Sequence, residues 1–367
     1  MKQCLLALIV VFNVTYLLAD VPKQVGNQRA KIVAKPVLQA NQPPAKLAPR
    51  SAKPSGVSYK PNCGRLGDQL ICYMHAKWVA YKYNLQLYYK PFIYSDQLVL
   101  DGVDQRYQEV LTRFLQPKPL LPGQSLEALL ADGDKGMLYE IPYFPESVEE
   151  LKTTVAPDSY DKFKRSTNIF AYFPVDWSDR KFKKLLQKLI APKQPLNLVP
   201  LPKNKLTIAL QVRKNSGGFD LPLLSDTPPA KFNPNQVYVD VVFPLKHPPE
   251  SYYIEQLQVA IKLFAGQPIY VYMFTDDPAP LPILERIKQA INDPKVEFAC
   301  RTTENNHYSN VLEDLFSMTK FDCLIRPDSN ISIVASKLGD FKLVISPAHH
   351  HWEERKLVID EVNLQMY

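Results

Sequence analysis

The sequence predicts an α/β protein with two Rossmann-like domains that face a cleft, preceded by a hydrophobic leader and a disordered stem. Dense apolar runs of strand length, such as residues 206–212 and 269–275, alternate with segments whose apolar residues recur every three or four positions. That alternation is typical of parallel sheets with right-handed helical crossovers. A length of 367 residues suits two domains of ordinary size plus appendages, and a hydrophobic content of 46% supplies a sizeable core.

Charge and cysteine content narrow the class of protein. The formal net charge is +7, and part of the basic excess lies between residues 20 and 60, where Asp20 is the only acidic residue. Because this part of the basic excess lies in a tail rather than in the folded body, it weakens the case for a nucleic-acid-binding fold. We therefore expect no nucleic-acid partner. Of the five cysteines, Cys4 lies in the leader. The other four are too few for a disulfide scaffold, so one or two bridges and buried free thiols are both open.

The first 58 residues form two appendages. Residues 4–19 are an apolar run behind Lys2, and at about 16 residues the run is short for a membrane span and closer to a signal-peptide core. A cleaved signal peptide and an uncleaved anchor over 1–19 are both open, so we expect a secreted or membrane-associated protein. Residues 20–58 are rich in Pro and Lys and lack periodicity, which predicts an extended stem.

Residues 59–204 are predicted as the N-terminal α/β domain, on the acceptor side. Apolar residues at helical spacing predict a helix over 66–83, and the alternation at 85–89 predicts a short strand. Residues 104–116 and 179–190 also have helical patterns.

Residues 205–367 are predicted as the C-terminal Rossmann-like domain, on the donor side. The apolar run at 206–212 suits a strand buried on both faces of a parallel sheet. Further strands are predicted at 269–275, 296–299, 323–326 and 342–346, and helices at 252–264, 281–292, 311–319 and 331–338.

A glycine turn opens the first predicted helix. Gly64 and Gly67 permit a tight turn that a Cβ atom would obstruct, and the start of a helix offers free N–H groups to an anion. Arg65 and Asp68 lie in the same turn. A structural turn with an N-cap explains this segment alone equally well.

Arg213 follows the buried strand at 206–212, at the edge where open α/β sheets bind ligands. A guanidinium can bind phosphate oxygens with two hydrogen bonds and neutralise the charge that grows on a diphosphate leaving group. Gln211 ends the strand, and Asp220 lies in the following loop. A structural surface arginine is the alternative.

Two adjacent carboxylates, Asp276 and Asp277, follow the next strand. Such a pair could bind a metal ion, contact a nucleotide or cap the turn that contains Pro278.

The predicted helix at 331–338 starts beside a polar segment. Serine hydroxyls and backbone N–H groups at a helix N-terminus suit a pyrophosphate. An aspartate there would repel phosphate unless it were paired, and Arg326 is the nearest candidate. The polar residues are Asp328, Ser329, Asn330 and Ser332.

Three consecutive histidines, at 349–351, precede Trp352. Consecutive side chains diverge on regular structure, so one metal ion could seldom use all three. We expect a solvated loop here, or one that faces an acceptor.

Together these segments resemble the α-1,2-fucosyltransferase family of the fucosyltransferase-like GT-B superfamily. Residues 64–84 resemble its Gly-x-Leu-Gly-Asn-Gln stretch, with Asp68 in place of Asn. Residues 206–220 resemble its strand ending in His-x-Arg-Arg-x-Asp, with Gln211 and Lys214 as departures. Residues 269–278 resemble its Phe-Ser-Asp-Asp segment, and residues 313–352 its donor-binding region. The match covers most of residues 62–352, with the segments in the family's order.

The resemblance implies a GT-B glycosyltransferase that transfers fucose with inversion from GDP-fucose to a glycan hydroxyl, in α-1,2 linkage and without a metal or other cofactor. It implies a catalytic role for Arg213 at the donor's pyrophosphate. The sequence does not single out the catalytic base, for which Asp68, Asp220 and His75 are the candidates. It implies acceptor-side roles for His75 and Trp352. The residues that it implies for donor binding are Gly64, Arg65, Gly67, Gln211, Arg213, Asp276, Asp277, Asp328, Ser329, Asn330 and Ser332.

Two other functions compete with this one. The departures at Gln211 and Asp68 favour a non-catalytic protein that binds a carbohydrate or nucleotide on the same fold. A protein O-fucosyltransferase or an α-1,6-type enzyme would share the arginine motif.

Overall fold

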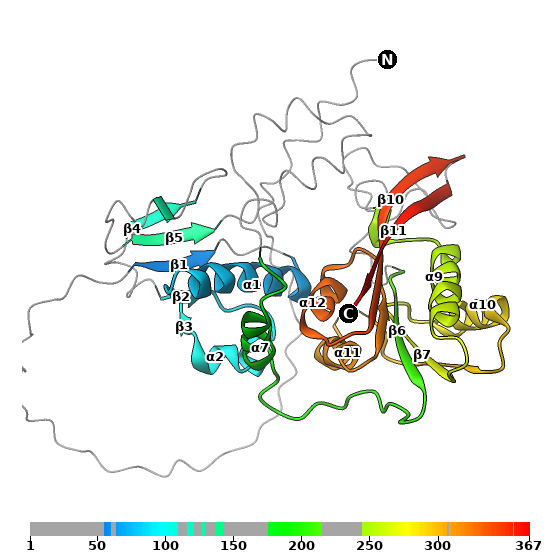
Figure 1. Ribbon diagram of the computed structural model, residues 1–367. Coiled ribbons are helices and arrows are strands. Elements are labelled where there is room, and N and C mark those ends of the chain that lie inside the picture. Colours follow the sequence, from blue (N-terminus) through cyan, green and yellow to red (C-terminus); the bar gives the residue numbers. More distant parts are fainter. Residues whose placement is uncertain are drawn as a thin grey trace, which may run out of the picture. The chain divides into compact units, whose positions relative to one another are not determined.

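The computed structural model describes residues 55–59, 64–108, 116–120, 127–128, 137–141, 175–214, 244–306, 308–354 and 356–367 (Figure 1). All of these belong to one structural unit, which spans residues 52–232 and 237–367. The predicted leader and residues 20–54 of the predicted stem lie outside the described ranges. Within those ranges we find no helix with the length and hydropathy needed to span a bilayer.

The fold is α/β with two separate sheets, as the sequence predicts. The first sheet is parallel throughout, with strand order β3-β2-β1-β5-β4. Its strands are β1 (Gly56–Tyr59), β2 (Gln86–Tyr89), β3 (Gln105–Arg106), β4 (Gln116–Pro119) and β5 (Met137–Ile141). The helices of this part are α1 (Leu66–Lys82), η1 (Ser95–Gln97), α2 (Leu100–Val103) and α7 (Arg180–Leu189).

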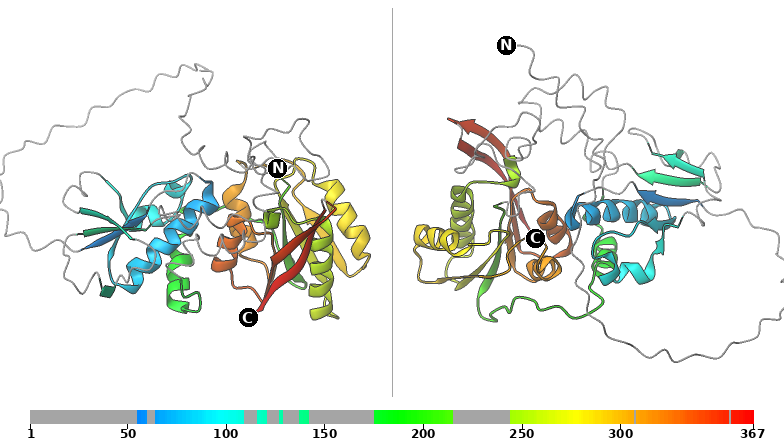
Figure 2. Two further views of the ribbon diagram at one scale, coloured as in Figure 1. Left: turned by 90° about the horizontal axis from the view of Figure 1, so that it is seen from above. Right: turned by 180° about the vertical axis from the view of Figure 1, so that it is seen from behind.

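The second sheet has strand order β11-β10-β9-β6-β7-β8 and is parallel except for the β10–β11 hairpin, a twisted ribbon at one edge (Figure 2). Its strands are β6 (Leu206–Val212), β7 (Ile269–Thr275), β8 (Val296–Cys300), β9 (Cys323–Ile325), β10 (Leu343–Glu353) and β11 (Lys356–Met366). Its helices are η4 (Pro244–Lys246), α9 (Glu250–Leu263), α10 (Leu281–Ile291), α11 (Val311–Met318) and α12 (Asn330–Leu338).

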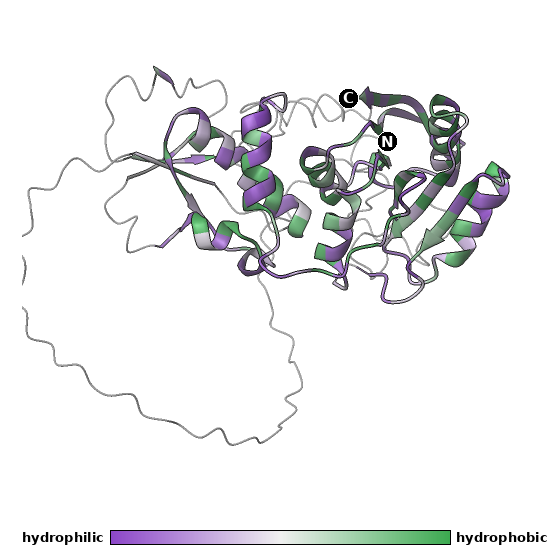
Figure 3. Ribbon diagram, turned by 60° about the horizontal axis from the view of Figure 1, so that its bottom comes forward, coloured by the Kyte–Doolittle hydropathy of each residue, from purple (hydrophilic) through white to green (hydrophobic). Residues whose placement is uncertain are grey.

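Strand β6 is buried along its whole length because helices cover both faces of the sheet. Its residues alternate between two cores: Ile208 and Leu210 pack with α9 and α10, whereas Ala209 packs with α11 and α12. The helices accordingly have one hydrophobic and one hydrophilic side (Figure 3). The core around Ala209 continues through α1 to β1 and β5, so α1 and α12 are fixed against each other in one packed core.

The start of the predicted helix at 104–116 is wrong, whereas residues 109–115 lie outside the described residues. Helix α2 ends at Val103, and Asp104 is buried, where its carboxylate accepts a hydrogen bond from the Tyr73 hydroxyl at 2.6 Å and pairs with Lys77. The next residues form β3, parallel to β2. Burial of one carboxylate beside α1 therefore overrides the helical pattern at the start of the segment.

Both ends of the folded chain also differ from the prediction. The first strand begins at Gly56, so the last residues of the predicted stem belong to the sheet. The predicted loop at the three histidines is strand β10, which continues to Glu353 because β11 pairs with it. His349 and His351 each bond one oxygen of Asp360 across the hairpin, at 2.8 and 2.9 Å.

Candidate functional site

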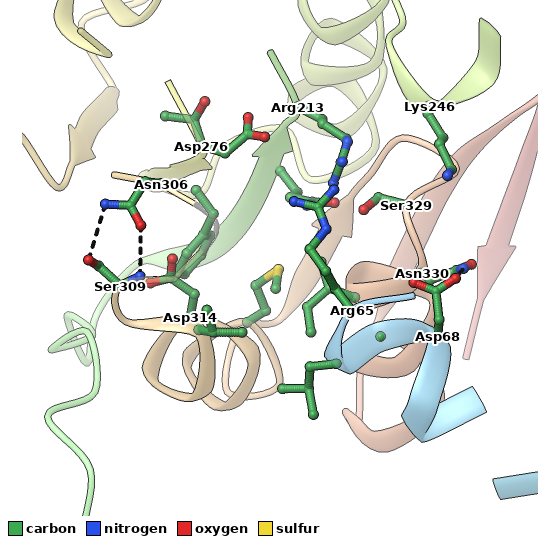
Figure 4. Close-up of a pocket in the computed structure, with 18 residues that line it drawn as sticks. Arg65, Asp68, Arg213, Lys246, Asp276, Asn306, Ser309, Asp314, Ser329 and Asn330 are labelled. Carbon is green, nitrogen blue, oxygen red and sulfur yellow. Dashed lines mark hydrogen bonds between the residues drawn. The ribbon is translucent and has the colours of Figure 1, made fainter. Parts of the chain in front are cut away.

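A cavity of about 130 Å³ lies where β6 and β7 end and where α1 and α12 begin (Figure 4). This is smaller than the pockets that enclose a whole drug-sized ligand, and it suits the polar part of one. Its walls come from these four elements and from η4, α11 and the loop at 306–309. The lining residues are Arg65, Leu66, Gly67, Asp68, Gln211, Arg213, Lys246, Phe274, Thr275, Asp276, Asn306, Ser309, Val311, Asp314, Met318, Ser329, Asn330 and Ile331.

The starts of α1 and α12 meet at a glycine. A Cβ atom on Gly67 would lie 2.5 Å from the backbone nitrogen of Ile331 and 2.7 Å from the carbonyl carbon of Asn330, so a larger residue does not fit. Beside this contact, the Asn330 amide nitrogen donates a hydrogen bond to Asp68 Oδ1 at 2.6 Å. The close approach directs the N-terminal ends of both helices into one cavity.

Neither helix start is capped by a side chain. The N-cap residues are Arg65 for α1 and Ser329 for α12, and neither side chain accepts a hydrogen bond from the first turn. Helix N-termini carry partial positive charge and orphan N–H groups, which favour an anion. Two such ends at one cavity favour an anion beside them, while the lining also holds the carboxylates of Asp68, Asp276 and Asp314.

Three half-buried cations line the cavity: Arg65, Arg213 and Lys246. In Figure 4 they lie on the same side of the view as Ser329. The backbone next to Arg213 is fixed by Asp276, whose Oδ1 accepts a hydrogen bond from the Lys214 N–H at 2.8 Å. The arrangement can bind an anion that carries several oxygens, such as a diphosphate.

Asp314 lines the cavity, and the pKa of its carboxyl differs from the ordinary value. Burial raises the pKa of its carboxyl to about 6, against the opposing effect of Arg301, whose Nη2 lies 2.7 Å from Asp314 Oδ1. The carboxyl is therefore mainly ionised at neutral pH. Gln211 lines the same cavity, and its Oε1 is buried without a hydrogen-bond partner in the described part of the chain. Both groups are placed to bind polar hydrogens of a ligand.

The cavity brings together eight of the residues named from the sequence. They are Arg65, Gly67, Asp68, Gln211, Arg213, Asp276, Ser329 and Asn330.

Other predicted donor-binding residues lie outside the lining. Gly64 packs against the Asp68 side chain. Asp277 accepts a hydrogen bond from the Ala279 N–H at 2.7 Å and so shapes the following turn. Ser332 is fully buried and donates to the Ser329 carbonyl at 3.0 Å.

The remaining predicted residues lie elsewhere or are not described. The Asp328 N–H donates to the Leu245 carbonyl, while Arg326 donates to the Pro327 carbonyl rather than pairing with Asp328. His75 is fully buried with its ring edge-on to Trp177, and Trp352 lies on β10. Asp220 lies outside the described residues.

Five polar residues of the lining have no site role in the sequence analysis: Lys246, Thr275, Asn306, Ser309 and Asp314. Asp314 lies in the segment 313–352 that resembles the donor-binding region, but its burial depends on packing that this segment does not encode. Asn306 and Ser309 belong to a polar, Asn-rich loop, which is a turn signal without chemical specificity.

No protein-family model matches the sequence, and no curated protein matches it. The structure is similar to several solved fucosyltransferases. Arabidopsis thaliana FUT1, as a mutant in complex with GDP, has 12% identity and a TM-score of 0.45, over 84% of this chain and 73% of that one. POFUT1 in complex with GDP-fucose has 12% identity and a TM-score of 0.39, over 80% and 96% of the two chains. The α-1,6-fucosyltransferase NodZ, co-crystallised with GDP, has 13% identity and a TM-score of 0.39, over 86% and 99%. With TM-scores below 0.5, these similarities do not assign this chain to a family or give it a function.

Proposed function

We propose that the protein is a glycosyltransferase that binds a GDP-sugar in this cavity and transfers the sugar to a glycan hydroxyl. GDP-fucose with inversion and α-1,2 linkage is the specific form that the motif resemblance favours. The observation that carries the proposal is that Arg213 and Ser329 line one cavity together with the uncapped starts of α1 and α12.

The chemistry of the leaving group fits this cavity. As the acceptor oxygen bonds to C1 of the sugar, the bond from C1 to the diphosphate breaks, and GDP leaves with the electron pair. The departing diphosphate gains negative charge, which Arg213, Arg65 and Lys246 can stabilise together with the helix N-termini. The proposal assigns no metal or other cofactor to this step.

The wall of the cavity that contains Asp314 fits the guanosine end of the donor. A guanine base offers an N1–H and an adjacent amino group, and the Asp314 carboxylate can accept from both. Adenine lacks this pair of donors, so a site built around Asp314 discriminates against ADP-sugars. The Gln211 carboxamide can accept a further hydrogen bond from the nucleoside.

The acceptor hydroxyl must lose its proton to a base. Asp68 is the candidate in the cavity, in the first turn of α1, with one oxygen held by Asn330. Asp220 is the second candidate.

We also propose that residues 1–19 direct the protein into the secretory route or hold it at a membrane, with residues 20–55 as a tether. The length and apolar composition of residues 4–19 support this.

Calorimetric titration of the purified protein with GDP tests the donor site, with Arg213→Ala as the key variant. We expect wild type to bind GDP in the calorimeter, and we expect Arg213→Ala to turn over GDP-fucose about a hundredfold more slowly than wild type. Arg180→Ala is the matched control, because Arg180 is exposed on α7 and does not line the cavity.

Incubation with GDP-fucose and a panel of oligosaccharides then tests transfer, and NMR of the product reads its linkage and anomeric configuration. Failure of wild type to bind GDP overturns the proposal. Binding without turnover favours a non-catalytic binding protein. Gln211 and Asp68, which differ from the family's motifs, support that alternative. A different linkage, or transfer to a protein hydroxyl, favours the related enzyme classes.

A further inference from the structure

The loop that joins β8 to α11 forms one wall of the cavity and is tightly bonded within itself. Asn306 Oδ1 accepts from the backbone N–H of Ser309 at 2.8 Å, and its amide nitrogen donates to Ser309 Oγ at 3.1 Å (Figure 4). The same Oδ1 also accepts from the backbone N–H of Tyr308 at 2.8 Å. The neighbouring Asn305 is buried and donates to the Arg301 carbonyl at 2.8 Å. Asn306 and Ser309 line the cavity, and the loop bonds hold the residue next to Ser309 close to it, although that residue is not itself part of the lining.

That residue is Tyr308, and its side chain is 67% exposed. A tyrosine combines a large apolar ring with a polar tip, and such residues are enriched where one ligand face is apolar and the other is hydrated. Exposed single aromatic residues are common on proteins, so exposure alone does not indicate a site. The structure around this one supplies the further evidence.

Tyr308 is bonded to a second tyrosine in an unusual conformation. The Tyr94 hydroxyl donates to the Tyr308 carbonyl at 3.1 Å. Tyr94 lies just before η1 with φ 64° and ψ 2°, in the left-handed region that a bulky side chain rarely adopts. The loop itself contains two more left-handed residues, Glu304 at φ 59° and Asn310 at φ 56°. Strained backbone that the surrounding structure maintains is characteristic of ligand-binding sites.

We propose that Tyr308, whose loop is held by the Tyr94 hydroxyl, presents an aromatic shelf beside the cavity, on which the glycan acceptor lies. The axial C–H groups of a pyranose give it one apolar face, which the electron-rich face of a tyrosine ring attracts, while the edge hydroxyls stay in water. The shelf holds the acceptor beside the cavity in which the donor's diphosphate binds. This inference rests on the proposed function and names the ligand class of its second substrate.

Acceptor kinetics at saturating GDP-fucose test the shelf. We expect Tyr308→Ala to raise the acceptor KM about tenfold, since an aromatic contact of this kind accounts for roughly that factor. Tyr308→Trp restores the ring and should return KM to near the wild-type value, which loss of loop structure would not allow. Tyr94→Phe removes the hydroxyl that bonds the loop and should give a smaller rise. The affinity for GDP, measured by calorimetry, should not change in Tyr308→Ala.

Tyr367→Ala is the matched control, because Tyr367 is 75% exposed after the end of β11, outside the loop. Saturation-transfer NMR with the same oligosaccharides and no donor reads acceptor binding separately from turnover. An acceptor KM and an NMR signal in Tyr308→Ala equal to those of Tyr367→Ala overturn the shelf, as does acceptance of a peptide hydroxyl in place of a sugar. Tyr308-dependent glycan binding without any turnover of GDP-fucose supports the shelf and refutes the transferase instead.

Discussion

Gly67→Ala tests whether the meeting of two helix starts creates the site. The new Cβ would lie 2.5 Å from Ile331 N and 2.7 Å from Asn330 C, where ordinary contact begins at 3.4 Å. The obstacle is backbone, which cannot rotate away, so α1 and α12 must separate by about 1 Å. Overpacking of this size costs about 2 kcal/mol of unfolding free energy. Weakening of the 2.6 Å bond between Asp68 and Asn330 costs about 1 kcal/mol more.

The same displacement acts on ligand binding. Because both helix N-termini face the cavity, a shift of about 1 Å misplaces the donors for a diphosphate, and we expect turnover to fall about a hundredfold. Urea unfolding gives the stability, and GDP titration with GDP-fucose turnover gives the function. Gly102→Ala is the control, because nothing lies within 4 Å of a Cβ at that position in α2. It should be neutral or stabilise by up to about 1 kcal/mol. If both variants unfold and bind GDP alike, the two helix starts do not form the site.

Two further predictions concern buried carboxylates. Burial raises the pKa of Asp314 to about 6, so GDP affinity should fall about tenfold as pH falls from 7 to 5 and the carboxylate is protonated, whereas Asp314→Asn should bind GDP weakly and keep in calorimetry only the pH dependence of the diphosphate itself. The raised pKa has the opposite effect on stability: its contribution is fully present below the ordinary pKa of 3.8 and is lost as pH rises through about 6, a loss of about 3 kcal/mol by urea unfolding that Asp314→Asn should abolish. Asp104→Asn should lower the unfolding free energy by about 3 kcal/mol, because it breaks a buried pair with Lys77, while Asp96→Asn at an exposed position should change it by less than about 0.5 kcal/mol. Equal stability of these last two variants would mean that the pair does not hold α1 against β3.

The parts of the fold that were predictable from the sequence are those in which one chain segment determines its own burial. Strands β6 and β7 match their predicted ranges because a dense apolar run is compatible with burial on both faces. The start of the helix predicted at 104–116 was wrong because Asp104 is stabilised by Tyr73 and Lys77, which are distant in sequence. The loop predicted at the three histidines, where the structure has the β10–β11 hairpin, was wrong for a similar reason. Its histidines look like a polar loop until Asp360 is placed opposite them.

The candidate site shows the same division. Arg213, Asp276 and Ser329 were predictable because the carboxyl ends of parallel strands share one edge, which brings the residues after them together. Lys246 and Asn306 come from connections whose path a local pattern cannot fix. Burial of Asp314 depends on the packing of α11, so its raised pKa was not visible in the sequence.

The cavity is polarised, and this bears on which way a donor would bind. Asp276 and Asp314 lie with Asn306 and Ser309 on one side of the view in Figure 4, whereas the cations lie on the other side with Ser329 and with Asp68, which accepts a hydrogen bond from Asn330. Asp276 accepts a hydrogen bond from the Lys214 N–H, and Asp314 pairs with Arg301, which lies outside the group of cations that line the cavity. A nucleoside diphosphate has the complementary polarity, with hydrogen-bond donors on a guanine at one end and anionic oxygens at the other. The proposed donor therefore has one favoured orientation, with the base toward Asp314 and the diphosphate toward the starts of α1 and α12.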